Sequence, residues 1–312
     1  MEIGKKIKGL KPIYGIIVAV LGILLLIFIA APIQSKFGML GLAITEIMIL
    51  LLAVIAAFIC KADLKTVFSI KKIKMTQLFG TVLIWIGSYL GIMILTLIIG
   101  YFFPESLINV SEGLSNVITS VPFGIAFFIV AIMPAICEEA LMRGFILSSF
   151  RSFKSKWSIV LLVGIIFGIF HLDFIRFAPT AILGMALAYI MLETNNILLP
   201  MIFHFINNGL STVTSFFISS RKVPLPELNS VPLISIGSYF IIGAIMPFML
   251  LLGAKLLKKG KCNLNEDYNH KKKINSVYIA TFLTILMLII GSIIVGVSIS
   301  KEPDFLLKQM GL

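Results

Sequence analysis

Charged side chains are scarce in this chain of 312 residues: Asp, Glu, Lys and Arg together make up 13%, whereas soluble domains contain roughly 25%. Hydrophobic residues account for 59%, and the mean hydropathy is +1.08. The longest polar loop expected on the inner side, residues 257–274, is a short basic linker. This composition excludes an ordinary soluble protein and indicates an integral membrane protein.

Cysteine is rare, and a strict alternation of polar and apolar residues is missing. The three cysteines are Cys60, Cys137 and Cys262, and their spacing predicts neither a disulfide nor a zinc knuckle. The strands of a membrane barrel alternate apolar and polar residues with period two. The apolar stretches here are continuous, so we exclude a β-barrel and expect helices.

Long apolar stretches recur along the whole chain, and a helix needs roughly 20 apolar residues to cross a bilayer. They predict an all-α fold, a polytopic membrane helix bundle with about eight or nine transmembrane helices. We expect residues 1–312 to form a single integral membrane domain. The candidate spans are 13–33, 38–60, 78–103, 122–149, 157–174, 178–194, 196–219, 233–256 and 275–299.

Basic residues outnumber acidic ones, 26 to 14, which gives a net charge of +12. With a cytoplasmic N-terminus, the inner side of the membrane holds 19 of the 26 basic residues and the outer side six, as the positive-inside rule requires. Topology and the lipid bilayer therefore account for the charge, and no nucleic acid partner is needed. The many Ile, Lys and Asn residues suggest an AT-rich bacterial genome, so we expect a bacterial cell membrane.

Three short polar clusters interrupt the apolar stretches in the middle of the chain. Ionisable groups inside a membrane are costly unless they are paired or face a water-filled cavity. Two carboxylates, two imidazoles and a carboxamide, buried together, are the groups from which a hydrolytic site is built. The clusters are Glu138-Glu139-x-x-x-Arg143, Phe167-x-x-x-His171 and His204-x-x-x-Asn208.

The two adjacent glutamates point in different directions, because successive residues of a helix are about 100° apart. Glu139 lies four residues before Arg143, on the same face, and we expect the two to form an ion pair. Glu138 then has no local cation and is free to act as a general base. Pro134 removes a backbone hydrogen bond, and the resulting kink can admit water beside Glu138. The alternative is a charge cluster at the inner end of a helix.

His171 is expected at the depth of Glu138. The two residues are similarly far from the loop 151–156 that joins their helices, roughly 20 Å along each helix at 1.5 Å per residue. Phe167, one turn before His171, either walls the site from lipid or serves in ordinary packing. A lone buried histidine is usually structural, but a histidine level with a buried glutamate favours a shared site.

His204 and Asn208 lie on one face of the span 196–219. Both can donate hydrogen bonds while neutral, as the stabilisation of an oxyanion requires; the alternative is hydrogen bonding between helices. Asn207 is rotated away and should pack elsewhere. Glu46, in the span 38–60, is either a packing partner, which we favour, or a second functional carboxylate. Small-residue ridges, which let helices approach closely, occur at Gly164-x-x-x-Gly168 and Gly184-x-x-x-Ala188.

The order and spacing of the three motifs resemble the CPBP family, which comprises the type II CAAX prenyl proteases and bacteriocin-processing proteins and is also called the Abi family. The resemblance covers residues 120–210, which we take as the catalytic core helices. It implies an intramembrane endopeptidase that cleaves a peptide or a membrane-anchored protein. The catalytic residues it implies are Glu138 and His171, which activate water, and His204 and Asn208, which stabilise the oxyanion; the supporting residues are Glu139, Arg143 and Phe167.

The need for a metal stays open at this point, and so does the choice between a glutamate-dependent enzyme and a metalloprotease. Glu138, His171 and His204 can supply a His₂Glu zinc set with water as the fourth ligand. That arrangement would remove Glu138 as the general base, and Glu139 is committed to Arg143. The sequence therefore favours a metal-free mechanism over zinc.

Two other functions compete with the protease. The chain could be a non-catalytic membrane immunity or regulatory protein of the same family that keeps the motifs for assembly. It could also be a proton-coupled transporter that relays protons through Glu and His. An inverted repeat would favour the transporter, and we find none in the sequence.

Overall fold

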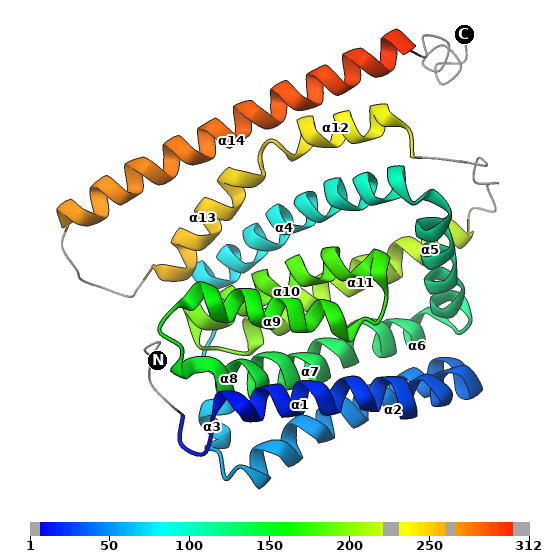
Figure 1. Ribbon diagram of the computed structural model, residues 1–312, viewed down its shortest axis with the longest axis vertical. Coiled ribbons are helices and arrows are strands. Elements are labelled where there is room, and N and C mark those ends of the chain that lie inside the picture. The colour runs from blue at the N-terminus through cyan, green and yellow to red at the C-terminus, as the bar shows by residue number, and fades with distance from the viewer. Residues whose placement is uncertain (1–6, 221–230, 260–265, 302–312) are drawn as a thin grey trace.

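The computed structural model describes residues 7–220, 231–259 and 266–301, and every regular element in this part of the chain is helical (Figure 1). The all-α helix bundle predicted from the apolar stretches is therefore confirmed. Three of the elements are π-helical (η1, η2 and η3) and one is a 3-10 helix (η4). The helices are α1 Pro12–Leu25, η1 Leu26–Ala30, α2 Ala31–Ile59, α3 Leu64–Val67, α4 Met75–Phe102, α5 Pro104–Thr119, α6 Phe123–Phe127, η2 Phe128–Ile132, α7 Met133–Glu139, η3 Ala140–Ile146, α8 Leu147–Ser149, η4 Phe150–Ser152, α9 Lys156–Phe170, α10 Phe174–Thr194, α11 Leu198–Ser220, α12 Leu233–Gly243, α13 Met246–Lys258 and α14 Glu266–Lys301.

Six helical runs in the described residues are long and apolar enough to cross a membrane. Each of the predicted spans coincides with one of these runs, with one arm of a run, with the shorter apolar helix α9 or with α11. The protein is thus an integral membrane protein. The six runs are Pro12–Ile59, Met75–Phe102, Phe123–Ser152, Phe174–Thr194, Leu233–Lys258 and Asn275–Lys301.

The first run, Pro12–Ile59, is a hairpin rather than one continuous helix. The chain reverses at Gly38, whose φ of 53° and ψ of −124° suit glycine, because a side chain there would be strained. Across the turn, the Gln34 amide donates to the Thr45 hydroxyl over 2.9 Å. The two predicted spans, 13–33 and 38–60, therefore form the antiparallel arms of this hairpin.

The predicted small-residue ridges lie against each other where α9 packs on α10. A Cβ built on Gly184 would lie only 3.0 Å from the Cα of Gly164 and 2.8 Å from the Cβ of Phe167. Larger residues would push the two helices apart. The close approach brings the backbone of α10 to the polar groups described below.

The central helices are the buried ones. In the most apolar window of the run Phe123–Ser152, 56% of the residues are buried inside the bundle, against 11% for the run Asn275–Lys301. The helix α14 accordingly lies at the edge of the bundle, beside α12 and α13 (Figure 1). The motif from Glu138 to Arg143 is thus carried by the most buried of these runs, where a precise side-chain arrangement can be maintained.

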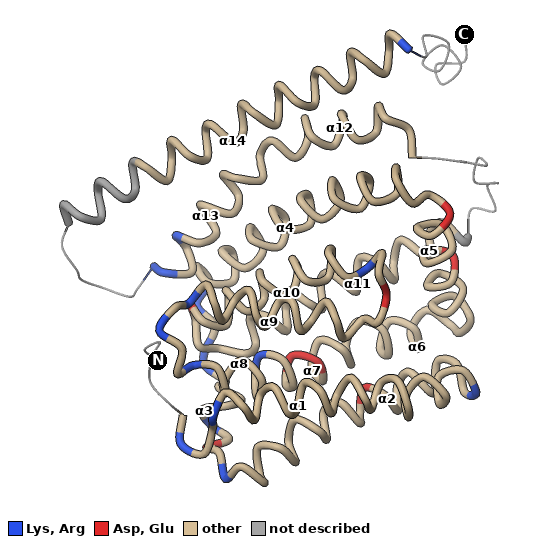
Figure 2. The backbone as a smooth tube through the Cα atoms, viewed as in Figure 1, with Lys and Arg blue, Asp and Glu red and all other residues tan. Residues whose placement is uncertain are grey.

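Most Lys and Arg residues gather at one end of the bundle. Figure 2 shows them around α3, the α8–α9 connection and the C-terminal end of α13, whereas the acidic residues of α5 lie at the opposite end. Under the positive-inside rule, the basic end faces the cytoplasm. The orientation with a cytoplasmic N-terminus stays a prediction.

We expect a membrane-impermeant thiol reagent, added outside intact cells, to leave Cys262 unlabelled. Cys262 lies in the basic linker, outside the described residues, and Cys60 and Cys137 are first replaced by Ser so that it is the remaining thiol. As the matched control, Lys36→Cys in the same background should label rapidly, because Lys36 is exposed and lies two residues before Gly38, where the hairpin turns. Rapid labelling of Cys262 would show that the orientation is inverted.

Candidate active site

The helix that carries the two glutamates is distorted on both sides of them. The π-helical segments η2 and η3 flank α7, and Pro134 stands in its first turn. Proline has no N–H to donate and disrupts the regular ladder, and π-helical turns are frequent at functional sites. Glu138 and Glu139 end α7, at the junction with η3, and they face different parts of the bundle.

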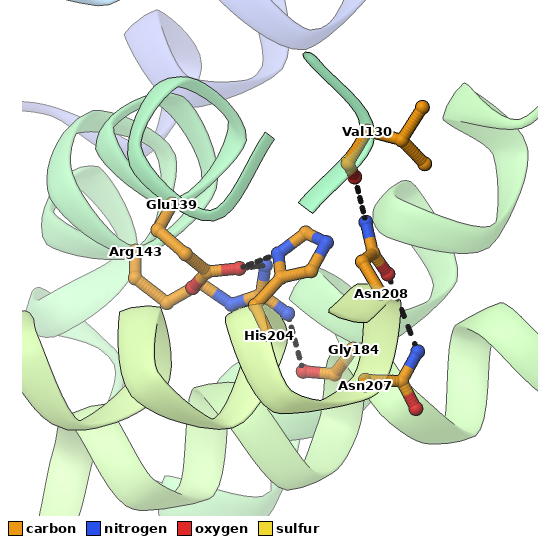
Figure 3. A network of polar contacts seen from close by, with 7 residues as sticks. All are labelled: Val130, Glu139, Arg143, Gly184, His204, Asn207 and Asn208. Atoms are coloured by element: carbon orange, nitrogen blue, oxygen red, sulfur yellow. Dashed lines mark hydrogen bonds and ion pairs between the residues drawn. The ribbon is translucent and has the colours of Figure 1, made fainter. Parts of the chain in front are cut away.

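Glu139 is the centre of a buried polar network. Its Oε1 atom accepts from Arg143 Nη1 over 2.8 Å and from His204 Nδ1 over 2.9 Å (Figure 3). The side chains of Glu139 and Arg143 are fully buried, and that of His204 is 3% exposed. The predicted ion pair between Glu139 and Arg143 is therefore present, and His204, 65 residues further along the chain, joins it.

Arg143 ties this network to α9 and α10. Its Nη2 atom donates to the backbone oxygen of Gly184 over 3.0 Å, and its guanidinium carbon lies 4.5 Å from the centre of the Phe167 ring. Such a cation–π contact is favourable, more so when the groups are desolvated. Phe167 is 1% exposed, and its ring centre lies 5.0 Å from that of His171 and 5.9 Å from that of His204. Of the two interpretations of Phe167, the structure shows packing inside the bundle.

Glu138 faces the other way, into a cavity of about 190 Å³ that it shares with His171. Both side chains, which the sequence placed at similar depth, thus line the same cavity. The cavity lies between the hairpin of α1 and α2, the end of α7, and the junction of α9 with α10. Its polar lining comes from Gln34, Thr45, Glu46, Glu138, His171 and Arg176.

The hydrogen bonds of the two histidines determine which ring nitrogen carries a proton. His171 Nδ1 lies 2.9 Å from the carbonyl oxygen of Phe167, which can only accept, so Nδ1 donates and Nε2 keeps a lone pair. His204 Nδ1 faces the carboxylate of Glu139, so it too is the donor. A neutral His204 of this tautomer has no proton on Nε2, and Nε2 donates only when the ring is an imidazolium.

Asn208 is held by a backbone carbonyl group. Its Nδ2 atom donates to the carbonyl oxygen of Val130 over 3.0 Å, while Asn207 Nδ2 donates to Asn208 Oδ1 over 3.3 Å (Figure 3). In a regular helix the carbonyl of Val130 would accept from the N–H of residue 134, which is proline. Asn208 therefore supplies a donor that Pro134 removes, and one N–H of its amide remains for another partner.

The cost of losing the Asn208 amide should depend on residue 134. Asn208→Ala should lower the free energy of unfolding by about 1–2 kcal/mol, because it removes a donor from a partly buried carbonyl. In a Pro134→Ala background the same change should cost clearly less, because the restored N–H can reach the oxygen of Val130. Thermal and denaturant unfolding in detergent measures all four variants, with Asn207→Ala as the neighbouring control. If Asn208→Ala lowers the free energy of unfolding equally in both backgrounds, the Asn208 amide does not replace the N–H that Pro134 lacks.

Three residues that line the cavity were not predicted as functional residues from the sequence. Glu46 was noted but preferred as a packing partner, Arg176 was counted only as an outer basic residue, and Gln34 was not considered. Arg176 lies in the first turn of α10, where its backbone N–H donates to Asp173 Oδ1 over 2.8 Å. Its separation from His171 by only five residues was the available signal.

The residues proposed for zinc do not form a ligand set. Glu138 and His171 line the cavity, whereas His204 is not among its lining residues and is bound to Glu139. Throughout the described part of the chain, no three His, Cys, Asp or Glu side chains come close enough together to hold a metal ion. The arrangement of these donors does not fit a His₂Glu zinc centre.

Comparison with known proteins bears on the central segment. No curated protein matches the chain, and no solved structure does either. One protein-family model, described as type II CAAX prenyl endopeptidase Rce1-like, matches residues 120–210, the segment that carries all three motifs. The segment with the buried Glu139 network and with Glu138 and His171 of the cavity therefore belongs to the type II CAAX prenyl endopeptidase Rce1-like family, as its motifs predicted.

Proposed function

We propose that this protein is a membrane-embedded endopeptidase that hydrolyses a peptide bond of a membrane-anchored protein or peptide. The observation that carries the proposal is that Glu138 and His171 line one cavity, whereas Glu139 is held by Arg143 and His204. The carboxylates of Glu138 and Glu139 thus have different proposed roles. Glu139 maintains the site, and Glu138 acts on water.

In the proposed reaction, Glu138 accepts a proton from a water molecule while His171 Nε2 orients that water through its lone pair. The oxygen of the water attacks the carbonyl carbon of the peptide bond. The negative charge that develops on the carbonyl oxygen is stabilised by the free N–H of Asn208 and by His204 as an imidazolium. The electrostatic interaction of Glu138 with both His204 and Arg143 supports this neighbourhood of the two groups.

We further propose that the reaction needs no metal ion. The engagement of His204 with Glu139, while Glu138 and His171 line the cavity, supports a glutamate-activated water. In this mechanism the carboxylate of Glu138 stays available to accept the proton of the water, which a zinc ligand could not do freely.

A comparison of peptides from two cell strains tests the function. Cells that express the wild-type protein should contain cleavage products that are missing from cells with Glu138→Gln. The same substrate peptide, given to purified protein after dialysis against a strong chelator, should still be cut. Identical peptides in both strains, with full biological effect of the variant, would indicate a non-catalytic membrane protein. Activity that is lost on dialysis and restored by zinc would keep the protease and overturn the metal-free mechanism.

A further inference from the structure

Glu46 is a second carboxylate on the wall of the cavity that holds Glu138. It belongs to α2, its side chain is 3% exposed, and its Oε2 atom has no hydrogen-bond partner in the described residues. The adjacent Thr45 hydroxyl is already engaged, because it donates to the carbonyl of Gly41 and accepts from Gln34. No contact that we observe explains a buried carboxyl group at this position as a packing residue.

The charges around the cavity indicate that one of the two carboxyl groups, Glu46 or Glu138, is protonated. Glu46 and Glu138 interact electrostatically and repel each other when both are ionised. The other titratable groups near Glu46 are Cys137, which is neutral as a thiol, and the cavity residues His171 and Arg176. Arg176 is the one cation on this wall in the described structure, and Asp173 at the start of α10 offsets part of its charge. The cations that act on Glu138 are His204, Arg143 and Arg176, whereas no cation in the described residues acts on Glu46, so the proton that the pair retains is on Glu46.

A peptide bond cannot be hydrolysed by a base alone. When the C–N bond of the tetrahedral intermediate breaks, the nitrogen must receive a proton, because an amide anion is too basic to leave. In the mechanism proposed above, Glu138 and His171 accept or orient, and His204 and Asn208 face the oxyanion. Glu138, once protonated by the water, can give that proton to the nitrogen. A carboxyl group that is protonated before the attack is a second source, and none of His171, His204 and Asn208 is assigned to this step.

We propose that Glu46 is the general acid of this site, a catalytic residue that donates its proton to the nitrogen of the scissile bond. This inference rests on the proposed endopeptidase function. Water adds to the carbonyl carbon while its proton passes to Glu138; the C–N bond then breaks as the proton of Glu46 passes to the nitrogen. Glu138 returns its proton to Glu46 through the cavity, so both carboxyl groups regain their starting states. The cavity of about 190 Å³ far exceeds the roughly 10–15 Å³ that one water requires.

Two substrates with different leaving groups separate acid catalysis from a structural role. One is a peptide that the wild-type protein cleaves, and the other is the matching aryl ester, whose phenolate departs without a proton. Glu46→Gln should lower kcat for the peptide by about 10²–10⁴-fold and kcat for the ester by less than about 10-fold. Glu138→Gln should lower both, since both reactions need activated water. Glu112→Gln, on the exposed side of α5, is the control for the loss of one carboxylate.

The pH dependence gives a second measurement. With Glu46 as the acid, the wild-type kcat for the peptide should fall at high pH as Glu46 loses its proton, and this fall should be missing from Glu46→Gln. If Glu46→Gln does not fold, Glu46→Asp decides, because it keeps an acid but moves it back: its peptide rate should fall more than its ester rate.

Equal losses on both substrates, in whichever of the two variants folds, would assign Glu46 a structural role and overturn the inference. Full peptide activity in Glu46→Gln beside an inactive Glu138→Gln would overturn it as well and leave the endopeptidase standing. Full activity in both Glu46→Gln and Glu138→Gln would disprove the proposed endopeptidase mechanism itself.

Discussion

Replacing Glu138 by Gln should lower kcat by about 10²–10⁴-fold, the usual contribution of a general base, with little change in thermal unfolding. Glutamine has the shape of glutamate but cannot accept the proton of water at neutral pH. The folded structure should tolerate the change, because Glu138 makes no ion pair in the described residues and faces a cavity rather than close-packed side chains.

The measurement is steady-state cleavage of a peptide by purified protein in detergent or vesicles, together with the unfolding temperature of each variant. Glu112→Gln, on the exposed α5, is the matched control and should behave as wild type. His171→Ala should also lower kcat, because it removes the group that orients the water. A Glu138→Gln protein that folds and retains more than about a tenth of the wild-type kcat would remove Glu138 as the base.

Glu139→Gln should destabilise the fold rather than act on catalysis alone. The change leaves the buried guanidinium of Arg143 without its carboxylate and removes the charged acceptor of His204. Breaking a buried ion pair from one side costs about 3–5 kcal/mol. We therefore expect a large fall in the unfolding temperature and in the yield of folded protein, with activity lost as a consequence.

A double variant tests this explanation. Replacing both partners, Glu139→Gln with Arg143→Gln, removes the uncompensated charge, so it should fold better than either single variant. Thermal and denaturant unfolding of the four proteins gives the coupling free energy between the two side chains. If Glu139→Gln is as stable as wild type, or if the two losses simply add, the buried pair does not hold this part of the bundle together.

The contrast between the two glutamates is what links the fold to the proposed chemistry. The two glutamates are adjacent in the sequence, but Glu139 binds Arg143 and His204 in a buried network, whereas Glu138 lines a cavity together with His171. The same substitution, Glu to Gln, should therefore give a folded, inactive protein at position 138 and an unstable one at position 139. Asn208 combines a structural and a proposed catalytic role. One N–H of its amide donates to the carbonyl oxygen of Val130, and the other remains for the proposed oxyanion.

The sequence by itself determined the features that depend on one helix at a time. Long apolar stretches require helices in a bilayer, because each backbone N–H and C=O must be satisfied within the segment. The 3.6-residue period separates Glu138 from Glu139 and places Glu139 beside Arg143, four residues on. The family resemblance over residues 120–210 likewise rests on local motifs and is supported by the matching family model.

Tertiary structure alone decided which helices present these groups to one another. The bonds from His204 to Glu139 and from Asn208 to Val130 join residues 65 and 78 positions apart, and Glu46 reaches the cavity through the hairpin turn at Gly38. Helices that are apolar all round carry little periodic signal to set their rotation. Their rotation follows from the close packing of small residues and from buried hydrogen bonds between helices, and these contacts exist only once the bundle has formed.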